Sequence, residues 1–233
     1  MVRETKRRVG RRTISYVLGA MVLIGVAGPA SVPVAAQFPG GGNPVTGVLA
    51  HASDNALDKL AQPGTFLNDK SIRIGIPGLG GGGSSLLGLG DQLGVTNGIT
   101  KSINDAAGMA AGAAKPIFRK AINTMSLSDA PGLVGKSDGA TQYLRKSAGA
   151  DLRTKIRPLI LAALGKTGAF QQLDKMGSAG SLLSGAGLSR DGLTDSVTDQ
   201  ALNGIFKYMG AEESKLRANP LGNASSLLGG IIK

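Results

Sequence analysis

The sequence predicts an all-α protein, an irregular array of several helices joined by Gly/Ser-rich loops. Three observations favour this fold class. Apolar residues recur every three or four positions over long stretches, strands and helices do not alternate, and no internal repeat of about 20 to 50 residues occurs. Each stretch therefore has an apolar face that needs to pack against another helix.

The N-terminus is predicted to be an export signal over residues 1–36. Six basic residues and one acid precede an uncharged run of apolar residues over 13–28, which is shorter than the about 20 residues of a spanning helix. We place cleavage after Ala36, and the pair Arg11-Arg12 is also typical of a twin-arginine signal. We expect a periplasmic or secreted protein with no transmembrane span after cleavage, and an uncleaved N-terminal anchor is the alternative.

After the signal, residues 37–44 are expected to form a flexible lead-in, and residues 45–233 a single helical domain. The first helix is predicted over 45–60, where apolar positions follow a helical spacing before Pro63-Gly64. The segment 65–77 alternates around three isoleucines and predicts a brief extended piece. The glycine-rich tract 78–90 predicts a loop.

A pair of helices is predicted between Ile99 and Met125. Pro116 lacks an amide donor, so the pair should kink or break near Lys115. The spacing from Ser126 to Asp129 is that of a capping box, which would open a short helix over 130–134.

Two longer helices follow. Ser137 is predicted to cap the first, which continues to Gly165, and a Gly/Ser-rich loop covers 177–189. The last long helix is expected over 191–217, before Asn219-Pro220. A final apolar segment over 227–232 should pack back on the core.

Four segments together resemble one known family. They are FLNDKSIRI (66–74), AKPIFRKAINTMSLSDAPGLV (114–134), GATQYLRKSAGADLRTKIRPLI (139–160) and VTDQALNGIFKYMGAEESKLRANP (197–220). In order and spacing they are similar to the exported bacterial proteins catalogued as domain of unknown function 4197. The resemblance implies a mostly helical exported domain with no established reaction. The glycine-rich stretches at 78–90 and 177–189 depart from the usual family pattern.

Charge and composition argue against several functions. The chain has 26 basic and 15 acidic residues, of which the signal holds 6 and 1, so the remainder carries 20 − 14 = +6. With only three Tyr, five Phe and no Trp, a basic groove with aromatic platforms for nucleic acid is not supported. The absence of cysteine excludes a thiolate nucleophile and a Cys-ligated metal. We expect an envelope protein or an anionic envelope component as the partner.

Catalytic motifs are present only in fragments. The stretch 78–83 fits G-x-G-x-x-G and follows a possible strand, but it lacks the helix and the parallel βαβ unit that a dinucleotide site needs. No S-x-x-K accompanies Lys166-Thr167-Gly168. His51 is the single histidine and is expected at the surface. We predict no cofactor, no metal site and no catalytic residue, and hence a binding or interaction module rather than an enzyme. A lipid or amphiphile carrier and a carboxylate-based hydrolase or lyase are the alternatives.

The candidate ligand-binding residues lie in the family-like segments and could converge on an anionic ligand, although a network that ties helices together is the alternative. They are Asp129, Tyr143, Arg145, Arg153 and Arg157.

Three aspartates, Asp191, Asp195 and Asp199, recur every four residues and would stack three like charges along one helix edge. Either a bound calcium ion or the positive end of the helix dipole could explain them.

Overall fold

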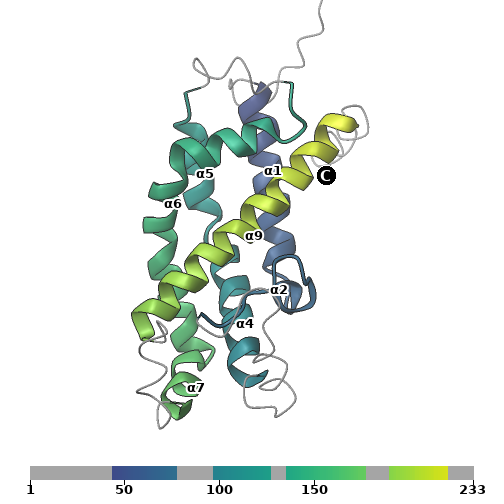
Figure 1. Cartoon of the computed structure of the whole chain (residues 1–233). Coiled ribbons are helices and arrows are strands. Elements are labelled where there is room, and N and C mark those ends of the chain that lie inside the picture. The colour runs from purple at the N-terminus through teal and green to yellow at the C-terminus, as the bar shows by residue number, and fades with distance from the viewer. Residues whose placement is uncertain (1–43, 78–96, 127–134, 177–188, 220–233) are drawn as a thin grey trace, which may run out of the picture. The chain divides into compact units, whose positions relative to one another are not determined.

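The computed structural model describes residues 44–77, 97–126, 135–176 and 189–219, and these residues form seven helices and no strand (Figure 1). The helices are α1 (Pro44–Leu60), α2 (Thr65–Asn68), α4 (Asn97–Ala113), α5 (Lys115–Asn123), α6 (Gly139–Lys166), α7 (Ala169–Met176) and α9 (Arg190–Ala218). The prediction of an all-α fold is confirmed. None of the helices in this part of the chain combines the length and the apolar content that crossing a membrane requires.

Several sequence predictions lie outside the described residues. They are the signal over 1–36, nearly all of the lead-in over 37–44, the loops over 78–90 and 177–188, the short helix over 130–134 and the apolar segment over 227–232. The division into a signal, a lead-in and one domain therefore stays a prediction.

The segment after α1 differs from the predicted extended piece. Its first residues form the one-turn helix α2, after Gly64 adopts a left-handed conformation with φ of 80°. Ile74 then has no partner strand, because the side chain of Asn104 in α4 satisfies its backbone. The Asn104 Oδ1 accepts from the Ile74 amide at 2.9 Å, and the Asn104 Nδ2 donates to the Ile74 carbonyl at 3.0 Å. The three isoleucines, Ile72, Ile74 and Ile76, are buried in an irregular segment.

The break at Pro116 is confirmed. Helix α4 ends at Ala113 and α5 begins at Lys115, with the proline near the start of α5, where a missing amide costs no hydrogen bond.

The prediction that Ser137 caps the next helix is wrong. The N-cap of α6 is Asp138, and its side chain makes no capping hydrogen bond. Instead, Glu213 of α9 accepts from the amides of Ala140 at 3.0 Å and Thr141 at 2.7 Å. Because a carboxylate of a distant helix satisfies these orphan amides, local sequence gives no sign of the cap.

Helix α9 packs across α1 and α6 and lies at the centre of the arrangement in Figure 1. The side chain of Phe206 meets Phe118 of α5 edge to face, with ring centroids 6.0 Å apart. Gly204 lets α9 approach closely, since a Cβ there would lie 2.9 Å from the Phe66 ring. These contacts hold α9 against α5 and α2, and α9 with α6 carries the candidate site.

Candidate functional site

One half of the α6–α9 interface is an aspartate ladder, by which we mean Asp191, Asp195 and Asp199 of α9 with Arg153 and Arg157 of α6. Arg153 Nε lies 2.6 Å from Asp199 Oδ1, and Arg157 Nε lies 2.8 Å from Asp195 Oδ1. Arg157 also reaches Asp191 at 3.0 Å, and Arg153 reaches Asp195 at 3.4 Å. Hydrogen bonds from Arg157 are the main cause that lowers the pKa of Asp195.

The ladder explains why three aspartates can recur every four residues. Two arginines interleave with them, so the like charges that would destabilise the helix are compensated from α6. No group of three potential ligands suited to a metal ion occurs in the described residues. The ion pairs with Arg153 and Arg157 thus account for the three aspartates, and neither a calcium ion nor the helix dipole is needed to explain them.

The spacing of four residues continues from Asp199 to Asn203, where the carboxylate is replaced by a neutral amide. Asn203 Oδ1 accepts a hydrogen bond from Arg145 Nη2. The guanidinium of Arg145 also lies over the ring of Phe206, 5.6 Å from its centroid. Arg145 makes no ion pair with any described residue, so its positive charge is oriented but not neutralised.

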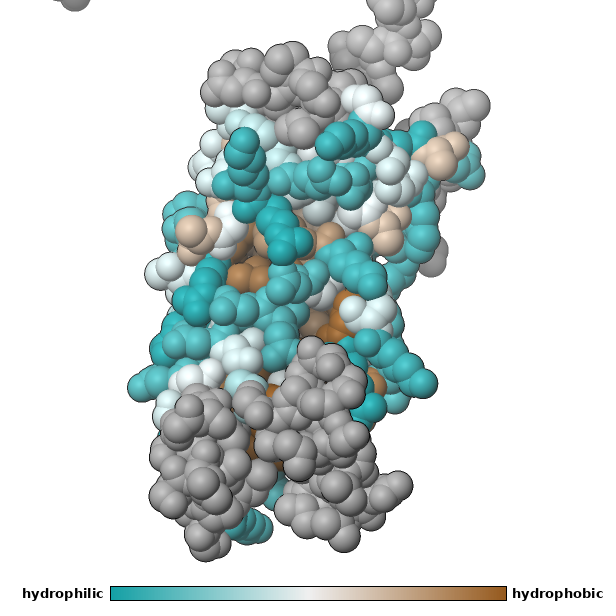
Figure 2. All heavy atoms as spheres, in the orientation of Figure 1, coloured by the Kyte–Doolittle hydropathy of each residue, from teal (hydrophilic) through white to brown (hydrophobic). Residues whose placement is uncertain are grey.

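Arg145 and Asn203 border a groove between α6 and α9, which we call the α6–α9 groove, with a volume of about 530 Å³. Its lining residues follow one face of each helix, at positions 138, 141, 142 and 145 near the start of α6 and at 203, 206, 207, 210, 211 and 214 of α9. On the face drawn in Figure 2, small patches of apolar surface are exposed between mostly polar side chains. The groove is open, has both polar and apolar residues in its lining, and is built on two helices.

Three charged residues line the α6–α9 groove. Arg145 and Lys207 are exposed cations, and Asp138 is a half-buried carboxylate that accepts from Gln142 Nε2 at 2.8 Å. Lys207 Nζ lies 3.5 Å from the Ser71 carbonyl, and together with the hydrogen bonds from Ser71 its charge helps to lower the pKa of Asp69. None of the three forms an ion pair within the described part of the chain, so the lining carries a net charge of +1.

The end of the groove is anchored from behind by Glu213, whose side chain is fully buried. Besides the two amides of α6, the side chain binds Arg217, four residues further along α9, whose Nε donates to Glu213 Oε1 at 2.8 Å. The Thr141 side chain adjoins this anchor, and its buried hydroxyl has no hydrogen-bond partner among the described residues. Buried polar groups without a hydrogen-bond partner are rare in native structures.

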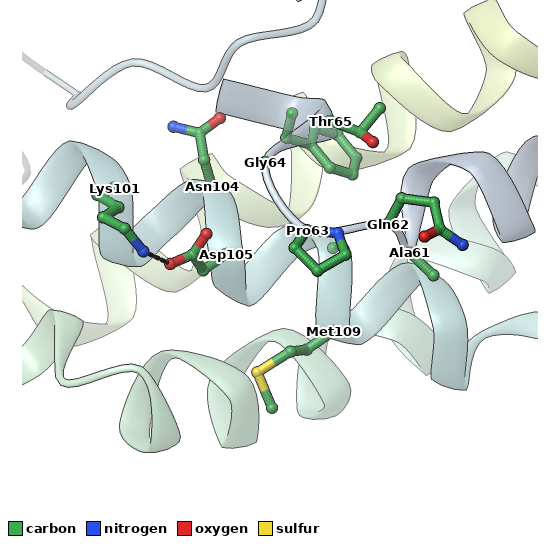
Figure 3. A pocket seen from close by; sticks show the side chains of 11 residues that line it. Ala61, Gln62, Pro63, Gly64, Thr65, Lys101, Asn104, Asp105 and Met109 are labelled. Carbon is green, nitrogen blue, oxygen red and sulfur yellow. Dashed lines mark hydrogen bonds and ion pairs between the residues drawn. The ribbon is translucent and has the colours of Figure 1, made fainter. Parts of the chain in front are cut away.

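A second pocket of about 260 Å³ lies between the α1–α2 turn and α4, and we call it the α4 pocket (Figure 3). Its two charges, Lys101 and Asp105, pair with each other. Asn104 is fully used by Ile74 and the Thr100 carbonyl. Met109 is 48% exposed at its edge. Because its polar groups already have partners, this pocket offers a ligand less than the groove does.

The four predicted ligand-binding residues that the structure describes lie at three different places. Arg145 lines the groove, whereas Arg153 and Arg157 belong to the ladder. The hydroxyl of Tyr143 donates to the Ser126 carbonyl at 2.7 Å. Asp129 lies outside the described residues.

Sequence reasoning missed most of the groove, namely Asp138, Thr141, Gln142, Asn203, Phe206 and Lys207. One signal was available. The four-residue period of the aspartates, extended by one step, reaches Asn203.

In the part of the chain that the structure describes, the carboxylates with displaced pKa values, Asp69, Asp195 and Glu212, are shifted downward. Hydrogen bonds from Ser71 lower the pKa of Asp69. Burial acts to raise the pKa of Glu212, but hydrogen bonds from Lys59 and Lys215 outweigh it and lower the pKa. Such groups are ionised at neutral pH and make poor general acids.

The model of one family, described as a protein of unknown function (DUF4197), matches residues 42–232. The chain belongs to this family. No curated protein and no solved structure matches it. The DUF4197 match includes both walls of the α6–α9 groove and the aspartate ladder.

Proposed function

We propose that this DUF4197 protein is an exported, non-enzymatic binding module of the cell envelope, which binds an anionic group of an envelope component in the α6–α9 groove. A single observation carries the proposal. Arg145 bonds to Asn203, the position at which the four-residue series on α9 changes from aspartate to asparagine. The guanidinium keeps a fixed orientation while its charge stays available.

The surroundings of Arg145 suit an anion. The Phe206 ring, only 6% exposed, covers one side of the guanidinium and limits its hydration. Lys207 adds a second cation to the same lining, and charge-assisted hydrogen bonds from an arginine to a carboxylate or phosphate are among the stronger polar interactions in proteins. Both cations point to a negatively charged ligand.

Export is supported by the order of a basic stretch, an apolar run and small residues within residues 1–36. A partner in the envelope follows from that location. Anionic groups are abundant on envelope polymers and lipid headgroups, so the positive lining fits this setting.

Two other functions have weaker support. A carboxylate-based hydrolase needs an acid with a raised pKa, yet the displaced carboxyl pKa values of Asp69, Asp195 and Glu212 are lowered. A lipid carrier needs an apolar cavity. The α6–α9 groove and the α4 pocket are both open and both have charged residues in their lining.

Native mass spectrometry of protein purified from the envelope fraction tests the proposal. We expect wild-type protein to retain an anionic molecule, and both Arg145→Gln and Asn203→Asp to lose it. Arg153→Gln is the matched control, because this arginine lies on the same helix but is already neutralised by aspartates.

The Asn203→Asp variant is the sharper arm, since it keeps the size of the side chain and supplies Arg145 with the carboxylate that the rest of the four-residue series has. A ligand retained equally by wild type and Asn203→Asp would contradict the proposed function.

A further inference from the structure

We propose that the ligand of the α6–α9 groove is a short zwitterionic peptide, with its terminal carboxylate held by Arg145 and its terminal ammonium held by Asp138. This inference rests on the proposed function and names the class of ligand. Four features of the groove support it.

The groove separates charges of opposite sign. Asp138 and Arg145 are two helical turns apart on α6, a separation of roughly 10 Å along the helix axis. The opposite wall has the same order, since Asp138 lies against Gly210 whereas Arg145 bonds to Asn203. A ligand that satisfies both ends needs an anionic and a cationic group at a matching distance.

The carboxylate of Asp138 is available for a ligand. At the N-cap position it would ordinarily bind the amides of the first turn, but Glu213 already occupies the Ala140 and Thr141 amides. Among the described residues, its side chain accepts one hydrogen bond, from Gln142, and otherwise packs against Gly210. Because Glu213 also offsets the positive end of the helix dipole, an ammonium group near Asp138 meets less repulsion.

The length of the groove suits about three residues of extended peptide, since each residue spans roughly 3.3 to 3.6 Å. At the end near Asp138, the wall on α9 has the small residues Gly210 and Ala211, which leave room for a peptide backbone, and Phe206 lies between them and Asn203. Ser137, Gln142 and Ser214 add polar side chains along the lining that can bond peptide groups.

The charge pattern also disfavours simpler ligands. A polyanion extended along the groove would meet the carboxylate of Asp138, whereas a simple cation would meet Arg145 and Lys207. A molecule with one charge of each sign avoids both conflicts, and this is specificity through repulsion.

Isothermal titration calorimetry of the full chain with trialanine, N-acetyl-trialanine and trialanine amide tests the inference. The acetylated peptide lacks the ammonium and the amide lacks the carboxylate. We expect trialanine to bind best and each modification to weaken binding about tenfold or more, which is typical of losing a hydrogen bond to a charged group. Dialanine and pentaalanine, shorter and longer than the groove, should bind more weakly than trialanine.

Variants assign each end of the peptide. Asp138→Asn should reduce trialanine affinity to that of the acetylated peptide and leave the acetylated peptide unaffected. Arg145→Gln should weaken both. Lys101→Gln, in the α4 pocket, should weaken neither, and thermal melting of each variant verifies that it is folded.

The outcomes separate the two proposals. If acetylated and free trialanine bind equally, and both depend on Arg145, the zwitterionic ligand is wrong and the anionic site stands. If no alanine peptide binds while native mass spectrometry finds an Arg145-dependent ligand, the peptide is again wrong. If neither experiment finds an Arg145-dependent ligand, both proposals fail.

Discussion

The two halves of the α6–α9 interface hold the two helices together by different kinds of contact. In the aspartate ladder, Arg153 and Arg157 are joined to α9 by several ion pairs whose side chains are largely exposed. In the groove half, one buried carboxylate, Glu213, holds the first turn of α6. Because the buried contact secures the helices there, the surface above it does not need matched charges. A buried contact that holds two helices together can thus leave an exposed arginine free of a structural ion pair.

Removal of Glu213 should have the largest effect on stability. Glu213→Ala leaves Arg217 and two amides of α6 without their acceptor, and loss of one partner of a buried ion pair costs about 3 kcal/mol or more. Urea unfolding followed by circular dichroism measures the loss. A decrease of the unfolding free energy no larger than that caused by a ladder variant would refute the role of Glu213 as the main anchor.

Acid should weaken the fold through its ionised carboxylates. The pKa values of Asp69, Asp195 and Glu212 are lowered in the folded state, so their contribution is present above the unfolded pKa and is lost as pH falls through the folded pKa. The unfolding free energy should therefore fall as the pH drops below about 4.

Unfolding curves at neutral and acidic pH test this expectation. Asp195→Asn should reduce the acid-dependent part of the stability, because its ladder contribution no longer titrates. An identical acid-dependent loss in this variant and in wild type would show that the ladder contributes nothing to the pH dependence.

Loss of Arg153 should affect mainly the stability of the fold, and loss of Arg145 mainly the binding of a ligand. Arg153→Met removes its ion pairs with Asp195 and Asp199 and should cost about 1 kcal/mol at most, since exposed pairs contribute little. Arg145→Met should cost less, because Arg145 has no carboxylate partner among the described residues. The urea midpoints of the two variants, compared with wild type, test the order. A larger loss for Arg145→Met would mean that the groove arginine serves mainly the fold.

The smallest expected effect is a gain. Asn203→Asp extends the ladder by one step and should raise the unfolding free energy by about 0.5 kcal/mol, the usual range for an exposed ion pair. Thermal melting at low and high salt detects it, because salt screens the added pair. A gain that does not change with salt would point to a cause other than the charge of Arg145.

Local sequence patterns were sufficient to predict the fold class and most helix boundaries. The periodicity of apolar residues located α1, α4, α5 and α9 closely, and Pro116 located the break between two of them. These features depend on local backbone chemistry, such as the missing amide of a proline and the spacing of one helix face. The sequence also identified Arg145 as a candidate ligand-binding residue.

The hydrogen bonds between polar groups of different segments could be identified only from the tertiary structure. Asn104 completes the backbone of Ile74, Glu213 caps α6, and Asn203 leaves Arg145 without a carboxylate, and each contact joins residues 30 or more positions apart. Helical periodicity fixes which residues share a face of one helix, but not which face of another helix they meet. The groove depends on that second relation, which packing of the whole core establishes.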